Sequence, residues 1–85
     1  MDKGKVIQSY VWHGDKCFFV STINRASSAY MCDGMYTETM AWTFDISDET
    51  IGDEIVMASG PLGSIFQHIE MCKQLHETGT IEEIK

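Results

Sequence analysis

The chain has 85 residues, a hydrophobic fraction of 44% and a formal net charge of −7. This length predicts one domain over residues 1–85, and the hydrophobic fraction excludes an intrinsically disordered segment. The acidic balance opposes binding to nucleic acid or to anionic lipid, because contacts with phosphates need clustered Lys and Arg side chains. We therefore expect neither a nucleic acid nor a membrane among the partners.

The cysteines and the first residues indicate the compartment. Cys17, Cys32 and Cys72 are too few and too widely spaced for a disulfide framework. Residues 1–5 lack the apolar core of a secretory signal. No stretch approaches the roughly 18 consecutive apolar residues that indicate a membrane span. We expect a cytoplasmic protein with free thiols.

Two strands joined by a tight turn are predicted first. Residues 5–13 and 16–25 alternate in the period of two that is typical of strands. Gly14 and Asp15 lie between them, and Gly supplies the positive φ that a short hairpin turn needs. Both strands carry apolar side chains on both faces: Tyr10, Trp12, Phe18 and Val20 are opposed by Ile7, Val11, Phe19 and Ile23.

A long connection over residues 26–35 leads to the strand on which the sheet is centred. The connection is too apolar for a loop that extends into water, and we expect it to pack along the sheet or to extend its neighbours. Residues 36–44 then alternate strictly, which predicts a half-buried antiparallel strand that ends at Asp45. One face carries Tyr36, Glu38, Met40, Trp42 and Phe44, and the other carries Thr37, Thr39, Ala41 and Thr43.

The last elements are a short strand and one helix. Residues 46–53 are acidic and typical of a turn, and residues 54–58 predict a fourth strand. Residues 64–78 predict a helix, with Ser64 as its N-cap and Gln67 completing a capping box. Gly79 lies where a left-handed residue ends a helix.

The order ββββα with short connections predicts an α+β fold. We expect a four-stranded antiparallel sheet with the C-terminal helix packed across one face, although the pattern does not say which face. The core is predicted from the larger apolar side chains: Tyr10, Trp12, Val20, Met40, Trp42, Phe44, Ile55, Ile65, Ile69, Cys72 and Leu75.

One group of residues has the spacing of a chemical site. His68, Cys72 and His76 are four residues apart and therefore share one stripe of the helix. Such side chains can bind zinc, and a Cys beside a His can act as a nucleophile. The stripe coincides with the apolar face of the helix, however, so we favour a core role and expect no metal and no cofactor.

Two other features have ordinary explanations. Glu38 is the one charged residue on its strand face, and a place at the sheet margin or a structural ion pair with Arg25 or Lys16 explains it better than catalysis. The acidic residues 45–54 depart from the spacing of a calcium loop.

These observations favour a non-enzymatic protein- or ligand-interaction module that acts as a homodimer, with another protein as a further possible partner. One helix covers one side of a sheet, and exposed apolar patches beyond a few hundred Å² are rare in monomers. The loop folding back over the sheet is the competing explanation. The alternative function is a small metal- or thiol-dependent enzyme that uses His68, Cys72 and His76. The predicted interaction surface consists of Ile7, Val11, Phe19, Ile23, Tyr30, Met31 and Met35.

Overall fold

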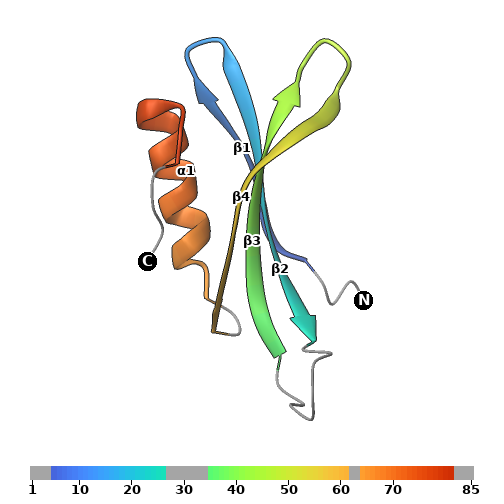
Figure 1. Cartoon of the computed structure of the whole chain (residues 1–85), viewed down its shortest axis with the longest axis vertical. Coiled ribbons are helices and arrows are strands. Elements are labelled where there is room, and N and C mark those ends of the chain that lie inside the picture. Colours follow the sequence, from blue (N-terminus) through green and yellow to red (C-terminus); the bar gives the residue numbers. More distant parts are fainter. Residues whose placement is uncertain (1–4, 27–34, 62–63, 82–85) are drawn as a thin grey trace.

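Four strands and one helix make up the described part of the protein, in the order that the sequence predicts. The computed structural model describes residues 5–26, 35–61 and 64–81. The elements are β1 (Lys5–His13), β2 (Lys16–Ala26), β3 (Met35–Asp45), β4 (Thr50–Pro61) and α1 (Phe66–Thr78). The strands form one antiparallel sheet in the order β1-β2-β3-β4, and α1 packs on one side of it (Figure 1). The predicted α+β fold is therefore confirmed.

The first hairpin follows its local signals. β1 has the predicted bounds, and β2 extends one residue beyond them. Gly14 has φ 63°, as the tight turn requires. Tyr10 pairs with Phe19 and Val11 pairs with Phe18. Because paired residues of an antiparallel sheet point to the same side, this register assigns each side chain to one of the two faces.

β4 is longer than predicted. It covers Thr50–Pro61, whereas the sequence pattern indicated residues 54–58. Its pairing extends along β3 from Asp45↔Thr50 to Tyr36↔Pro61, with irregular register around Trp42. Glycine and acidic residues have low strand propensity, and in β4 their extended conformation depends on hydrogen bonding to β3.

The two ends of α1 differ in how well they were predicted. The helix begins at Phe66, and its N-cap is Ile65, which makes no side-chain capping bond. The predicted capping box of Ser64 and Gln67 is wrong, because the Gln67 amide instead donates to the Ser59 carbonyl of β4. The C-terminal end is as predicted: Gly79 has φ 77°, and its N–H donates to the Leu75 carbonyl at 2.9 Å.

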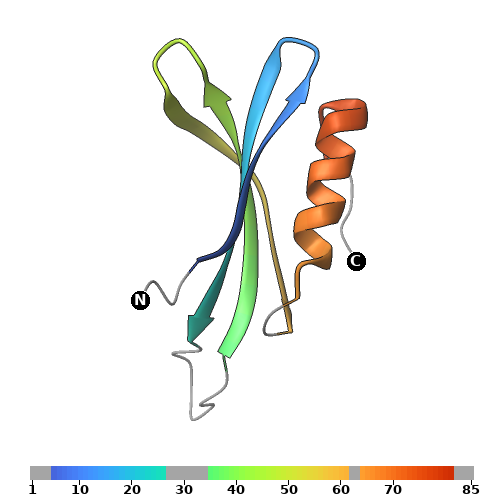
Figure 2. The ribbon, with the colours of Figure 1, turned by 180° about the vertical axis from the view of Figure 1, so that it is seen from behind.

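The core lies between α1 and the face of the sheet that carries the smaller side chains. It contains Val11, Phe18, Val20, Ala41, Met71 and Leu75, with Ile55, Val56, Ala58, Cys72 and Ile81 packed against it. Figure 2 shows the same arrangement from behind, with α1 beside the sheet on one side. Val20 and Leu75 were predicted correctly, and Ile55 and Cys72 are partly buried.

Four of the predicted core residues are wrong: Tyr10 is 59% exposed, Trp12 47%, Ile65 40% and Ile69 52%. Two physical reasons account for this. A helix approaches a sheet closely where the side chains between them are short, and the alanine and threonine face of β3 meets that need better than its aromatic face. On the helix, the inward stripe contains His68, Met71 and Leu75, so Ile65 and Ile69 point away from the sheet.

The connection between β2 and β3 lies mostly outside the described residues, and so do Tyr30, Met31 and Cys32. Within the described part of the chain, no helix is long and apolar enough to span a membrane.

Candidate functional site

The face of the sheet opposite α1 carries most of the aromatic side chains, and we call it the open face. The register places residues from all four strands on it. They are Gln8, Tyr10, Trp12, Cys17, Phe19, Ser21, Ile23, Tyr36, Glu38, Met40, Trp42, Phe44, Ile51, Glu54, Met57 and Ser59. Among the described elements, the helix lies on the other side (Figure 1).

Four rings form an aromatic cluster on the open face, made of Tyr10, Phe19, Trp42 and Phe44. The Tyr10 ring centroid lies 5.1 Å from that of Phe19 and 5.0 Å from that of Phe44, in tilted and edge-on contact. Phe19 stacks on Trp42 at 5.7 Å. These separations are those of favourable aromatic pairs, so the rings form a single patch across β1, β2 and β3.

The cluster is only partly shielded from water. Phe19 and Cys17 are buried beneath their neighbours, and Met40, Trp42 and Phe44 are half-buried. Tyr10, Trp12, Ile51 and Met57 are each about half exposed. Four large apolar side chains are thus exposed together on one side of a small protein, which is typical of an interaction surface.

Polar residues occupy the other end of the open face. The Gln8 amide donates to the Ser21 hydroxyl at 3.2 Å. Glu38 pairs in register with Ile23 and Ser59, and it is only 5% exposed. The open face therefore has an aromatic end near the two hairpin turns and a polar end farther along the strands.

The predicted interaction surface is divided between the two faces. Phe19 and Ile23 lie on the open face, whereas Val11 is in the core beneath α1, and Ile7 is in register with the buried Thr22. Met35 pairs with Ala26, and Tyr30 and Met31 lie outside the described residues. The described members of the set therefore do not form one surface.

Sequence reasoning missed Tyr10 and Trp42 as members of an open face, because it assigned large apolar side chains of these strands to the core, and it gave Met57 no role. The signal that could have found them is the alternation of β3. Between the end residues Met35 and Asp45, its other face contains only Thr and Ala, which suits close contact with a helix.

The chain was also compared with known proteins. No family model, no curated protein and no solved structure matches it.

A buried polar network lies under α1 and includes the first of the predicted site residues. His68 is 2% exposed, with Nε2 at 2.7 Å from the Ser9 hydroxyl and Nδ1 at 2.8 Å from the Thr22 hydroxyl. Thr22 Oγ1 lies 2.7 Å from Thr39 Oγ1. Burial lowers the pKa of His68, because the charged ring would lose its hydration. Both ring nitrogens of His68 are thus engaged by hydroxyl groups.

The other two residues of the predicted stripe also have protein partners. Burial raises the pKa of the Cys72 thiol, and a hydrogen bond with Ser9 opposes part of that rise. His76 Nδ1 donates to the Trp12 carbonyl at 2.9 Å, and His13 Nδ1 donates to the His76 carbonyl at 2.9 Å. These bonds fasten the C-terminal end of α1 to the end of β1.

Among the described residues, no group of three or more His, Cys, Asp or Glu side chains is placed to hold a metal ion. The contacts of His68, Cys72 and His76 are structural, and an enzyme built on them stays a prediction from sequence. A raised thiol pKa also works against Cys72 as a nucleophile, because the thiolate is the reactive form.

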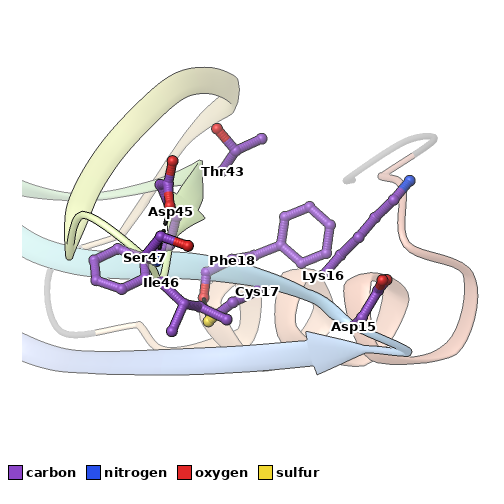
Figure 3. Close-up of a pocket in the computed structure, with 9 residues that line it drawn as sticks. Asp15, Lys16, Cys17, Phe18, Thr43, Asp45, Ile46 and Ser47 are labelled. Carbon is purple, nitrogen blue, oxygen red and sulfur yellow. Dashed lines mark hydrogen bonds between the residues drawn. The ribbon is translucent and has the colours of Figure 1, made fainter.

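A cavity of about 320 Å³ opens between the two hairpin turns. Figure 3 shows Asp15 and Lys16 at one turn, with Asp45 and Ser47 at the other. The Asp45 carboxylate accepts the backbone N–H groups of Ser47 and Asp48 at 2.9 and 3.2 Å, so it is occupied in shaping its turn. The cavity combines acids, one Lys and apolar rings, which together select no particular ligand chemistry.

Proposed function

We propose that this protein is a non-enzymatic interaction module that pairs with a second copy of itself through the open face. The observation that carries the proposal is the aromatic cluster, together with Trp12, Ile51 and Met57, on the face opposite α1. Burying such side chains is the main favourable contribution to protein association.

The size of the patch suits a protein partner. Side chains of these types and exposures leave on the order of 600 Å² of apolar surface on this face. A standard interface buries about 800 Å² on each partner, so the patch with its polar margin is of the right size. A small ligand would leave most of this area exposed.

The character of the patch favours a second copy over a basic partner. Its exposed members are apolar, and Glu38 on the same face is almost fully shielded. The exposed Glu54, which is in register with Trp42, lies on the edge strand β4 at the margin of the patch. An apolar sheet face can pack against its own copy, because two sheets pack face to face and a two-fold axis brings the same surface of each copy together.

Pairing through the sheet edges is less favoured than pairing through the open face. β1 has a register shift between Lys5 and Ile7, and β4 has irregular pairing near its exposed acids Asp53 and Glu54. Bulges and charges on an edge strand oppose the addition of another strand.

Two substitutions of equal starting exposure test the proposal. Met57 on the open face and Ile69 on the outer side of α1 are each 52% exposed. We expect Met57→Lys to abolish self-association, because the interface would bury two uncompensated ammonium groups. Ile69→Lys should leave self-association unchanged, and both variants should keep the wild-type circular dichroism spectrum.

Sedimentation equilibrium at micromolar concentration is the measurement. Wild type and Ile69→Lys should sediment at about twice the 9.6 kDa mass of one chain, and Met57→Lys should sediment as one chain. A wild-type mass of one chain would refute the proposal. Loss of association in Ile69→Lys alone would assign the interface to α1 instead.

A further inference from the structure

All three histidines of the chain lie where α1 meets β1. The chain contains His13, His68 and His76 and no other histidine. His68 contacts Ser9 of β1 and Thr22 of β2, and the other two exchange bonds between the end of β1 and the end of α1. Imidazole is the side-chain type that changes charge near neutral pH.

The three histidines differ in what a second ring proton would do. His13 and His76 each donate from Nδ1 to a backbone carbonyl, and protonation of Nε2 keeps those donors in place. His68 is buried between two hydroxyl groups, and in its neutral form one nitrogen donates while the other accepts. Protonated His68 could still donate to both hydroxyls, but its charge would be enclosed without hydration.

The groups around His68 do not compensate for such a charge. Cys72 lies one turn away on α1 and bonds Ser9, and it is a thiol of raised pKa. The ionisable groups in register on the covered face are His13 and Lys16, at the far end of the first hairpin, and Asp45, at the neighbouring turn of the second hairpin. On β2, β3 and β4 the residues beneath the helix are not ionisable: Val20, Thr22, Thr39, Ala41, Val56 and Ala58.

The carboxylates of α1 are also turned away from His68. Glu70 and Glu77 are both exposed, and Glu70 accepts a bond from Gln74 at 3.1 Å. Within the described parts of the chain, protonated His68 would therefore meet hydroxyls, a thiol and apolar side chains.

We propose that His68 is a pH-sensitive latch, whose neutral ring holds α1 on the sheet and whose protonation releases the helix. Release would expose Met71 and Leu75 of α1, and the apolar side chains that face them from the sheet. The latch lies on the side of the sheet opposite the open face, so it does not depend on what occupies that face.

The direction of the pH dependence follows from the burial of the ring. In the docked state the pKa of His68 is below its ordinary value of 6.5, and in the released helix it returns to that value. The contribution of His68 to docking is therefore fully present above about pH 6.5 and is lost as the pH falls below that value. The ratio of released to docked helix should rise by up to about tenfold per pH unit until the pH passes the lowered pKa.

Two variants separate His68 from the other histidines. His68→Gln keeps an amide that donates and accepts without titrating, so its helix docking should not change with pH. His13→Gln combined with His76→Gln leaves His68 as the one histidine, and this double variant should keep the wild-type response. Hydrogen exchange of the α1 amides, corrected for intrinsic rates and compared with the β2 and β3 amides, reports docking from about pH 8 to about pH 5.

The outcomes decide the inference in either direction. A pH-dependent loss of α1 protection in wild type and in the double variant, but not in His68→Gln, supports the latch. An equal loss in His68→Gln, or none in the double variant, overturns it. If His68→Gln does not fold, nuclear magnetic resonance of the double variant decides: the His68 ring signal must titrate in step with the loss of α1 protection.

Discussion

Leu75→Ala tests which face of the sheet forms the core. Leu75 is fully buried on α1, in the cluster that includes Val11, Val20 and Met71. Truncating a buried Leu costs about 2–5 kcal/mol, and the cost is lower where the surroundings can move into the space. Because α1 contacts the sheet from one side and can shift toward it, we expect Leu75→Ala to lower the free energy of unfolding by about 3 kcal/mol.

That loss is large for this chain. Domains of 85 residues have free energies of unfolding of about 4–13 kcal/mol. A loss of about 3 kcal/mol should lower the melting temperature by roughly 12–24 °C.

Tyr10→Ala is the matched change on the open face. Tyr10 is 59% exposed, although it contacts the rings of Phe19 and Phe44. Removing the Tyr10 ring loses part of two ring contacts and little buried area, so we expect the free energy of unfolding to fall by less than about 2 kcal/mol.

Urea denaturation followed by circular dichroism gives both free energies. The measurements are best made in the Met57→Lys background at one protein concentration, because self-association would add to the apparent stability. A larger loss for Tyr10→Ala than for Leu75→Ala would refute the assignment of the core to the helix side.

Two further substitutions test local contacts. Thr22→Val should lower the free energy of unfolding by about 1–3 kcal/mol in urea denaturation, because His68 Nδ1 and the Thr39 hydroxyl each lose a buried partner. The control Thr50→Val, at an exposed position, should change the free energy of unfolding by less than about 0.5 kcal/mol. Gly79→Ala should lower the melting temperature more than Gly14→Ala, since both residues have positive φ but only at Gly79 would a Cβ meet the His13 ring, at 2.8 Å. Equal losses at the two glycines would show that the His13 ring moves aside without cost.

Local signals in the sequence were enough for the element order and for most element ends. Period-two alternation and the Gly14 turn define β1 and the start of β2, and the positive φ of Gly79 ends α1. These features depend on neighbouring residues, so they can be predicted without knowledge of the fold. The full extent of β4 could not be predicted, because its end residues are strand only through pairing with β3.

The tertiary structure alone decided which face of the sheet is covered. Period-two alternation separates the two faces of β3 but does not say which of them meets α1, and the size of Trp42 and Phe44 suggested the wrong one. Docking of the helix depends on how closely it can approach, and the short side chains of Thr39 and Ala41 allow that approach. The same docking buries His68 against Ser9 and Thr22, residues that are 59 and 46 positions distant in the chain. The sequence shows a histidine at helical spacing, but only the packing of α1 on β1 and β2 supplies its two hydroxyl partners.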